Sequence, residues 1–97
     1  ALNTVALGAE TTLFSVIGDD EDAERLLSLL QKENIDTKYL VKNAERITTS
    51  KTRIISRNQQ MMRLDNETTA DISEDDVEQL LHSFSAYVKR YQPAVVI

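Results

Sequence analysis

The feature that most constrains the fold is an apolar, β-branched run at residues 12–17, Thr-Leu-Phe-Ser-Val-Ile. Such a run is typical of a strand that is buried on both faces of a sheet. A turn is expected next, at Gly18-Asp19-Asp20, where an aspartate can cap the helix predicted by the apolar spacing over 23–30. Since residues 1–7 also look helical and stop at Gly8, the order helix, strand, helix indicates an α/β protein.

The middle of the chain, residues 37–65, has no helical period and contains neither Gly nor Pro. A short strand is expected at 39–41, and two longer strands at 47–57 and 60–65. These two are only half apolar, which favours an antiparallel layer with one solvent-exposed face. A tight, even-numbered loop would sort the side chains into two faces, whereas an odd loop or a bulge would mix them. The two expected sets are Lys51, Arg53, Ile55, Gln60, Met62 and Leu64, and Thr52, Ile54, Ser56, Met61, Arg63 and Asp65.

The last helix is marked at both ends. Ser73 suits the N-cap, with Asp76 at the third helical position, and apolar residues follow the 3.6-residue period from Val77 to Tyr91. Pro93 should end the helix, and residues 94–97 are expected to begin another buried strand. Because the chain opens in a helical run without Met and closes on this apolar run, we expect residues 1–97 to form a single partial domain.

Composition excludes several classes of function. The net charge of −5 argues against binding to nucleic acid, which needs clustered Lys and Arg. Without cysteine the chain can form neither a disulfide nor a Cys-based metal site, which fits a cytoplasmic protein. No apolar run approaches the roughly 20 residues of a membrane span, so no membrane partner is expected.

Two glycines carry a resemblance to a known family. Ala1 is followed by six residues and Gly8, and then by nine residues and Gly18. This spacing resembles the first signature of the ribokinase-type (PfkB) sugar kinases. The short stretches Leu-Gly-Ala at 7–9 and Val-Ile-Gly-Asp-Asp at 16–20 also resemble that family. The resemblance implies part of a central, mainly parallel sheet with helices, plus an antiparallel β lid at approximately residues 37–65.

Residues 52–65, Thr-Arg-Ile-Ile-Ser-Arg-Asn-Gln-Gln-Met-Met-Arg-Leu-Asp, carry a narrower resemblance. They resemble the lid of heptose 7-phosphate kinases, the kinase half of the two-headed enzymes that make ADP-heptose for bacterial lipopolysaccharide. This resemblance implies a parent protein that uses ATP and Mg²⁺ to phosphorylate a heptose 7-phosphate, and a homodimer formed through the lid. The family's catalytic Asp, in a Gly-Ala-Gly-Asp stretch, does not occur in these residues. We therefore expect no catalytic, ATP-binding or metal-binding residue here, and no activity from residues 1–97 alone.

The lid contains the candidates for binding a phosphorylated sugar. Arg presents a flat fork that matches phosphate oxygens, and Gln can bind sugar hydroxyls. The candidates are Lys51, Arg53, Arg57 and Arg63 for the phosphate, and Gln59 and Gln60 for the hydroxyls. The alternative is that these side chains are the solvated face of a half-exposed strand.

Other residues that could act in catalysis or metal binding have structural explanations. His82 lies off the apolar stripe of the last helix and is expected at the surface, and Asp19-Asp20 is interpreted as a turn and helix cap rather than an Mg²⁺ site. Two other functions remain open. One is a ribokinase-type kinase for another sugar, such as fructose 1-phosphate, ribose or a nucleoside. The other is a small, non-catalytic α/β dimerisation module.

Overall fold

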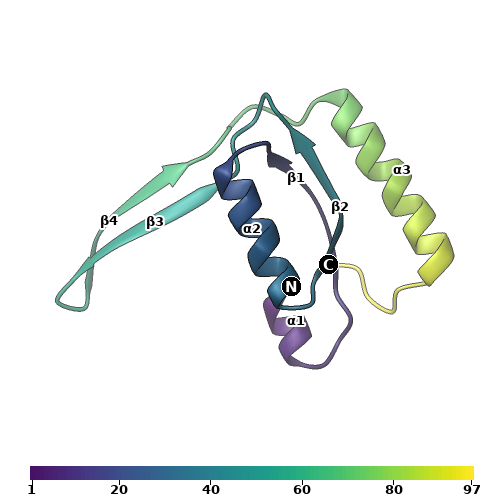
Figure 1. The fold of residues 1–97 in the computed structure, drawn as a ribbon, viewed down its shortest axis with the longest axis horizontal. Coiled ribbons are helices and arrows are strands. Elements are labelled where there is room, and N and C mark those ends of the chain that lie inside the picture. The colour runs from purple at the N-terminus through teal and green to yellow at the C-terminus, as the bar shows by residue number, and fades with distance from the viewer.

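The computed structural model describes residues 1–97 and contains helices on a parallel pair of strands and a separate antiparallel hairpin (Figure 1). The parallel pair is β1–β2, and the hairpin is β3–β4. This confirms the predicted α/β class with an antiparallel β layer. The elements in chain order are α1 (Leu2–Ala6), β1 (Thr12–Gly18), α2 (Glu21–Lys32), β2 (Asp36–Asn43), β3 (Ser50–Ser56), β4 (Gln59–Asn66) and α3 (Glu74–Tyr91).

The helix ends form as their sequences predict. Asp20 caps α2, since its Oδ1 accepts a hydrogen bond from the backbone N–H of Ala23 at 2.8 Å. Asn34, with φ of +58°, closes the same helix in the left-handed conformation. Ser73 caps α3 by accepting from the N–H of Asp76 at 3.2 Å. These local signals fix where the two long helices begin and end.

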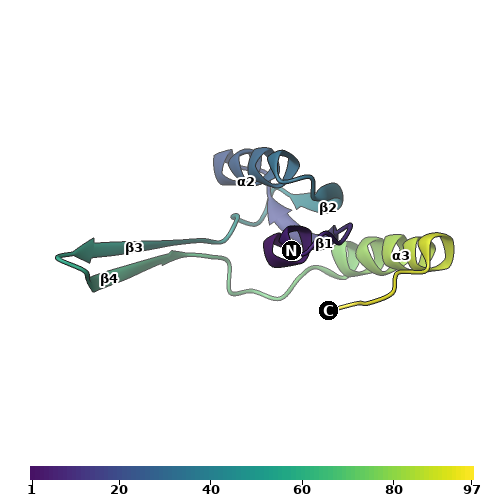
Figure 2. The ribbon, with the colours of Figure 1, turned by 90° about the horizontal axis from the view of Figure 1, so that it is seen from below.

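The parallel strands carry a helix on each face (Figure 2). Phe14 of β1 stacks on Tyr39 of β2 with ring centroids 4.6 Å apart, and its ring also meets Phe84 and Tyr87 of α3 edge-on. Neighbouring strand residues point to opposite faces. The face of β2 opposite to Tyr39 accordingly points toward α2, and Lys42 on that face pairs with Glu24 of α2. β1 thus has cover on both faces, although it is fully buried only at its end, Ile17-Gly18.

The lid boundary expected at 37–65 needs a correction. The strand expected at 39–41 is part of β2, which pairs in parallel with β1 and belongs to the main sheet. Only β3 and β4 form the hairpin, and Figure 1 shows it extending away from the rest of the molecule. The reason is long-range: β2 is matched to β1 by backbone pairing, which its half-polar sequence does not reveal.

The strand expected at residues 94–97 does not form. α3 ends at Tyr91, the next residue, Gln92, turns the chain with a φ of +46°, and the residues after Pro93 run as an irregular tail. Val95 and Val96 are 72% and 61% exposed. A strand needs a neighbour for its backbone groups, and no strand pairs with this tail.

The molecule exposes much more surface than a globule of its mass. Its accessible surface is 7859 Å², whereas a compact protein of 11.0 kDa exposes about 5,600 Å². The excess comes from the hairpin arm and from the uncovered side of α3 and the tail, where large apolar side chains reach solvent. None of the helices combines the length and apolar character that crossing a membrane requires.

Candidate functional site

The register of the hairpin decides which lid residues share a face. At its tip Ser56 pairs with Gln59 and Ile55 with Gln60, but from Ile54 onward the pairing shifts by one residue. Met61 is the extra residue of this bulge in β4. A one-residue shift moves every later side chain of β4 to the other face.

The bulge overturns the two face sets expected for a regular hairpin. Thr52 pairs with Leu64 and Ile54 with Met62, so these form an apolar face. The opposite, cationic face contains Lys51, Arg53, Ile55, Gln60, Arg63 and Asp65. Arg63 is therefore brought to the same face as Lys51 and Arg53, and Met62 and Leu64 leave that face.

Two of the three cations on this face already have carboxylate partners. Lys51 Nζ lies 3.3 Å from Asp65 and 3.2 Å from Glu67, and Arg63 Nε lies 2.8 Å from Asp65. Hydrogen bonds from Glu67 and Asp65 raise the pKa of Lys51. Burial acts to raise the pKa of Asp65, but the hydrogen bonds from Arg63 and Lys51 outweigh it and leave the pKa lowered. Both groups therefore stay charged near neutral pH.

Arg53 is different, because it takes part in no salt bridge. It pairs across the strands with Arg63, so two like charges stand directly opposite each other. Like charges directly opposite each other destabilise a hairpin, and Asp65 offsets the charge of Arg63 but not that of Arg53. With three cations against Asp65 and Glu67, the cationic face keeps one positive charge.

The remaining candidates lie at the tip of the hairpin. Arg57 and Asn58 both have positive φ, +47° and +64°, which is the two-residue type I′ turn that suits the twist of a hairpin. Gln60 shares the cationic face, whereas Gln59 pairs with Ser56 on the apolar face. The structure thus gathers Lys51, Arg53, Gln60 and Arg63, and leaves Arg57 in the turn and Gln59 on the other side.

The hairpin is joined to the sheet where β1 and β2 end, and Thr48 is at the centre of this junction. Its Oγ1 accepts from Gly18 N at 3.0 Å, and its own N–H donates to Asp20 Oδ2 at 2.7 Å. Hydrogen bonds from the Thr48 backbone and side chain and from Ala23 lower the pKa of Asp20. Ligands of open parallel sheets bind beyond the carboxyl ends of the strands, so the hairpin rises from the edge where a ligand is expected.

The chain segments on either side of the hairpin are also tied together. The Arg46 guanidinium donates to the carbonyls of Ala70 and Asp71, at 3.0 and 2.9 Å. The Asp76 carboxylate accepts from Ser73 Oγ at 2.7 Å and from the side-chain amide of Asn43. Bonds from Ser73 and Asn43 lower the pKa of Asp76. The sequence predicted the pairing of Ser73 with Asp76, but the Asp76 carboxylate accepts from the Ser73 hydroxyl and not from its backbone N–H. Neither the bond of Asp76 to Asn43 nor the part played by Arg46 has a local signal.

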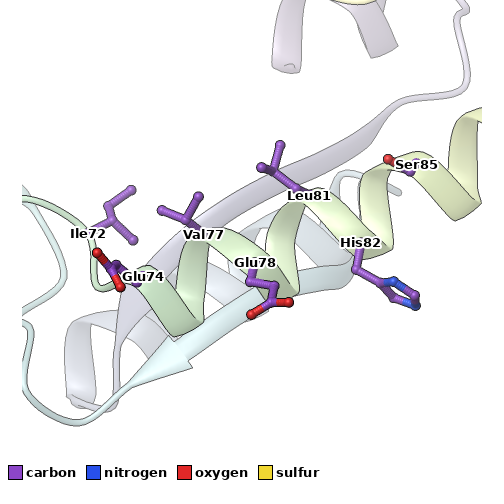
Figure 3. A pocket seen from close by; sticks show the side chains of 7 residues that line it. All are labelled: Ile72, Glu74, Val77, Glu78, Leu81, His82 and Ser85. Atoms are coloured by element: carbon purple, nitrogen blue, oxygen red, sulfur yellow. The ribbon is translucent and has the colours of Figure 1, made fainter.

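A shallow pocket on α3 contains none of the candidate residues (Figure 3). Ile72, Val77 and Leu81 point to one side of the helix, and Glu78 and His82 point to the other. Ile72 and Val77, which line this pocket, stand just before the Ser73 cap and four positions after it, the spacing of a hydrophobic staple. His82 is exposed, which confirms its predicted surface position.

Comparison with known proteins supports the resemblance found in the sequence. The model of the pfkB family of carbohydrate kinases matches residues 1–91. The bifunctional protein HldE of Sulfurimonas denitrificans is 36% identical over 97% of this chain, that of Helicobacter pylori strain Shi470 is 34% identical over 99%, and that of Methylobacillus flagellatus is 37% identical over 100%. The chain spans only about a fifth of the length of these relatives, 20–21%. It belongs to the pfkB family of carbohydrate kinases.

Proposed function

We propose that this chain forms the lid and part of the sugar site of a kinase that transfers the γ-phosphoryl group of ATP to a hydroxyl of a heptose 7-phosphate. The observation that carries the proposal is the pairing of Arg53 with Arg63 on one face of the hairpin. The resemblance of residues 52–65 to the lids of heptose 7-phosphate kinases points to the same substrate.

A phosphate dianion suits this face. It removes the repulsion between two opposed guanidinium groups, and each guanidinium can donate two parallel hydrogen bonds to its oxygens. Arg53 is the leading phosphate contact, because no carboxylate competes for it, and Arg63 supports it from the opposite strand. Gln60 lies on the same face, which supports a contact between its side chain and a sugar hydroxyl. Lys51, with two carboxylate partners, contributes mainly to the order of the lid base.

The other two candidates have different parts. Arg57, in the turn, can close over the far end of the substrate as the lid folds down. Gln59 lies on the apolar face, where a hydroxyl contact would require the turn to rearrange. We rank these two below Arg53 and Arg63 as substrate contacts.

ATP and Mg²⁺ are expected to bind other parts of the protein, because the family's Gly-Ala-Gly-Asp stretch does not occur in residues 1–97 and Asp19 and Asp20 already have partners. Both Asp20 oxygens already accept backbone N–H groups, and Asp19 faces the Lys42 ammonium at 3.4 Å. No three His, Cys, Asp or Glu side chains cluster as metal ligands. Because ATP is an intracellular metabolite, we place the enzyme in the cytoplasm.

The apolar face of the hairpin supports a homodimer through the lid. An isolated two-stranded hairpin is marginally stable in water. Ile54, Met62 and Leu64 share one face and are 44%, 52% and 52% exposed. Packing against the same face of a second lid would cover them and leave the cationic face free for substrate.

The test is a kinase assay of the full-length protein with ATP and a panel of sugars. We expect phosphorylation of heptose 7-phosphate and little of heptose, ribose or fructose 1-phosphate. Turnover of one of the other sugars in preference would support the alternative ribokinase-type kinase. A full-length protein that binds no ATP and still dimerises would replace the proposal with the non-catalytic module.

A further inference from the structure

Thr48 is the most constrained residue between the sheet and the hairpin. It is only 5% exposed, whereas its neighbours Ile47 and Thr49 are exposed. Its contact with Gly18 is so close that a Cβ added to that glycine would lie 2.7 Å from Thr48 N. The segment entering the hairpin, residues 44–49, is therefore fixed to the end of β1 at one point.

The segment leaving the hairpin, residues 67–73, has no such contact with β1 and is held through the entering segment. Arg46 donates to its carbonyls at residues 70 and 71, and more weakly to that of Thr68 at 3.5 Å. Ile47 N donates to Thr68 Oγ1 at 3.1 Å. The two segments thus form one unit, whose direction depends on Thr48 and on the Asn43–Asp76 contact at the start of α3.

Because the hairpin is long, a small change of angle at this junction becomes a large displacement at its tip. The seven residues of β3 extend about 23 Å at roughly 3.3 Å per residue. A rotation of about 10° at the base then moves the tip by about 4 Å and Arg53, three residues along β3, by about 2 Å. A shift of about 2 Å is enough to take a phosphate contact of Arg53 out of hydrogen-bond range.

We propose that Thr48 is a positioning residue, whose hydroxyl sets the angle of the hairpin over the carboxyl edge of β1 and β2 and so aligns the cationic face with the substrate. The kinetic consequence rests on the proposed function, whereas the angle itself does not. Arg46 holds the segment leaving the hairpin, residues 67–73, to the entering segment, so the position of both depends on Thr48.

The experiment measures the angle and the kinetics of the full-length protein separately. Residues 1–97 contain no cysteine, so spin labels at Ser28→Cys on α2 and Met61→Cys near the tip report the distance between sheet and hairpin once any cysteine elsewhere is replaced. Both sites are exposed. The test variant is Thr48→Val, which keeps the shape and the backbone bond to Asp20 but removes the acceptor for Gly18. Thr48→Ser restores that acceptor, and Thr49→Val is the matched control.

We expect one narrow distance peak for the wild type, Thr48→Ser and Thr49→Val, and a peak broadened or displaced by about 4 Å for Thr48→Val. With heptose 7-phosphate, KM should rise about tenfold in Thr48→Val while kcat stays within about threefold, because the chemical groups lie elsewhere. If Thr48→Val fails to fold, Arg46→Gln, which cuts only the tie between the two segments, should broaden the same peak.

A Thr48→Val distance peak identical to that of the wild type overturns the proposal, and so does a broadened peak with unchanged KM in an active enzyme. A broadened peak in a protein that phosphorylates no heptose 7-phosphate leaves the positioning role standing and refutes the proposed function instead.

Discussion

Replacing Gly18 with Ala tests the close approach between the end of β1 and the base of the hairpin. The new Cβ would lie 2.6 Å from Asp20 Oδ2, 2.7 Å from Arg46 O and 2.7 Å from Thr48 N. Ordinary contacts begin near 3.4 Å, so two backbone atoms must each retreat by about 0.7 Å. Overpacking of this kind costs typically about 1–3 kcal/mol, and it also stretches the bond from Gly18 N to Thr48.

The magnitude should appear in the chemical denaturation of the full-length protein. We expect the domain that contains Gly18 to lose about 2 kcal/mol of unfolding free energy in Gly18→Ala, a factor of about 30 in its folded-to-unfolded ratio. Gly8 is the control, because its φ is +84° and no atom lies within 4 Å of an added Cβ. Gly8→Asn, a residue that tolerates positive φ, should therefore be nearly neutral. Equal stability of Gly18→Ala and wild type would refute the account of the junction.

Three further predictions concern the helix caps, acid stability and the apolar face. Ser73→Ala should cost about 1 kcal/mol in denaturant unfolding, as the loss of an N-cap does, and a cost near zero would contradict that cap. Hydrogen bonds led by the one from Thr48 lower the pKa of Asp20, so its stabilising effect is present above the ordinary value of 3.8 and is lost as pH falls below it. Unfolding curves at pH 7 and pH 3 should then differ less for Asp20→Asn than for the wild type, and an equal difference would contradict this. Leu64→Glu should shift the full-length protein toward monomer in analytical ultracentrifugation while Gln79→Glu, on the exposed side of α3, does not, and a dimer unaffected by Leu64→Glu would remove the lid from the interface.

The elements with local signals could be predicted from the sequence. Asp20 and Ser73 cap helices because a short polar side chain can reach N–H groups two or three residues ahead. Gly8 and Asn34 close helices because both tolerate positive φ. In each case the residues involved are close together in the chain, so the local sequence is enough to predict the structure they form.

The hairpin faces could not be predicted, because two signals conflict there. Arg57-Asn58 favours a two-residue turn, which alone would place Arg63 opposite Thr52. The observed register at the base pairs Arg63 with Arg53. The two registers differ by one residue, and Met61 is that extra residue, unpaired in the bulge. Since Met61 and Met62 are equally apolar, the sequence pattern does not indicate which of them leaves the ladder.

The junction was missed for a different reason. Thr48 and Gly18 are thirty positions apart, and Arg46 contacts carbonyls more than twenty positions away. No periodicity encodes such contacts. The tail at 94–97 shows the converse, since its composition suits a strand but no neighbouring strand is present to pair with it.

In the proposed function, Arg53 on the cationic face recognises the phosphate of the substrate. The most direct measurement is the ratio of kcat/KM for heptose 7-phosphate to that for unphosphorylated heptose, in the full-length wild type, in Arg53→Ala and in the control Arg25→Ala on α2. Loss of one charge-assisted contact predicts that Arg53→Ala lowers this ratio by about 10–100-fold, through the phosphorylated sugar alone, and that Arg25→Ala leaves it unchanged. A ratio in Arg53→Ala equal to that of the wild type would contradict the claim.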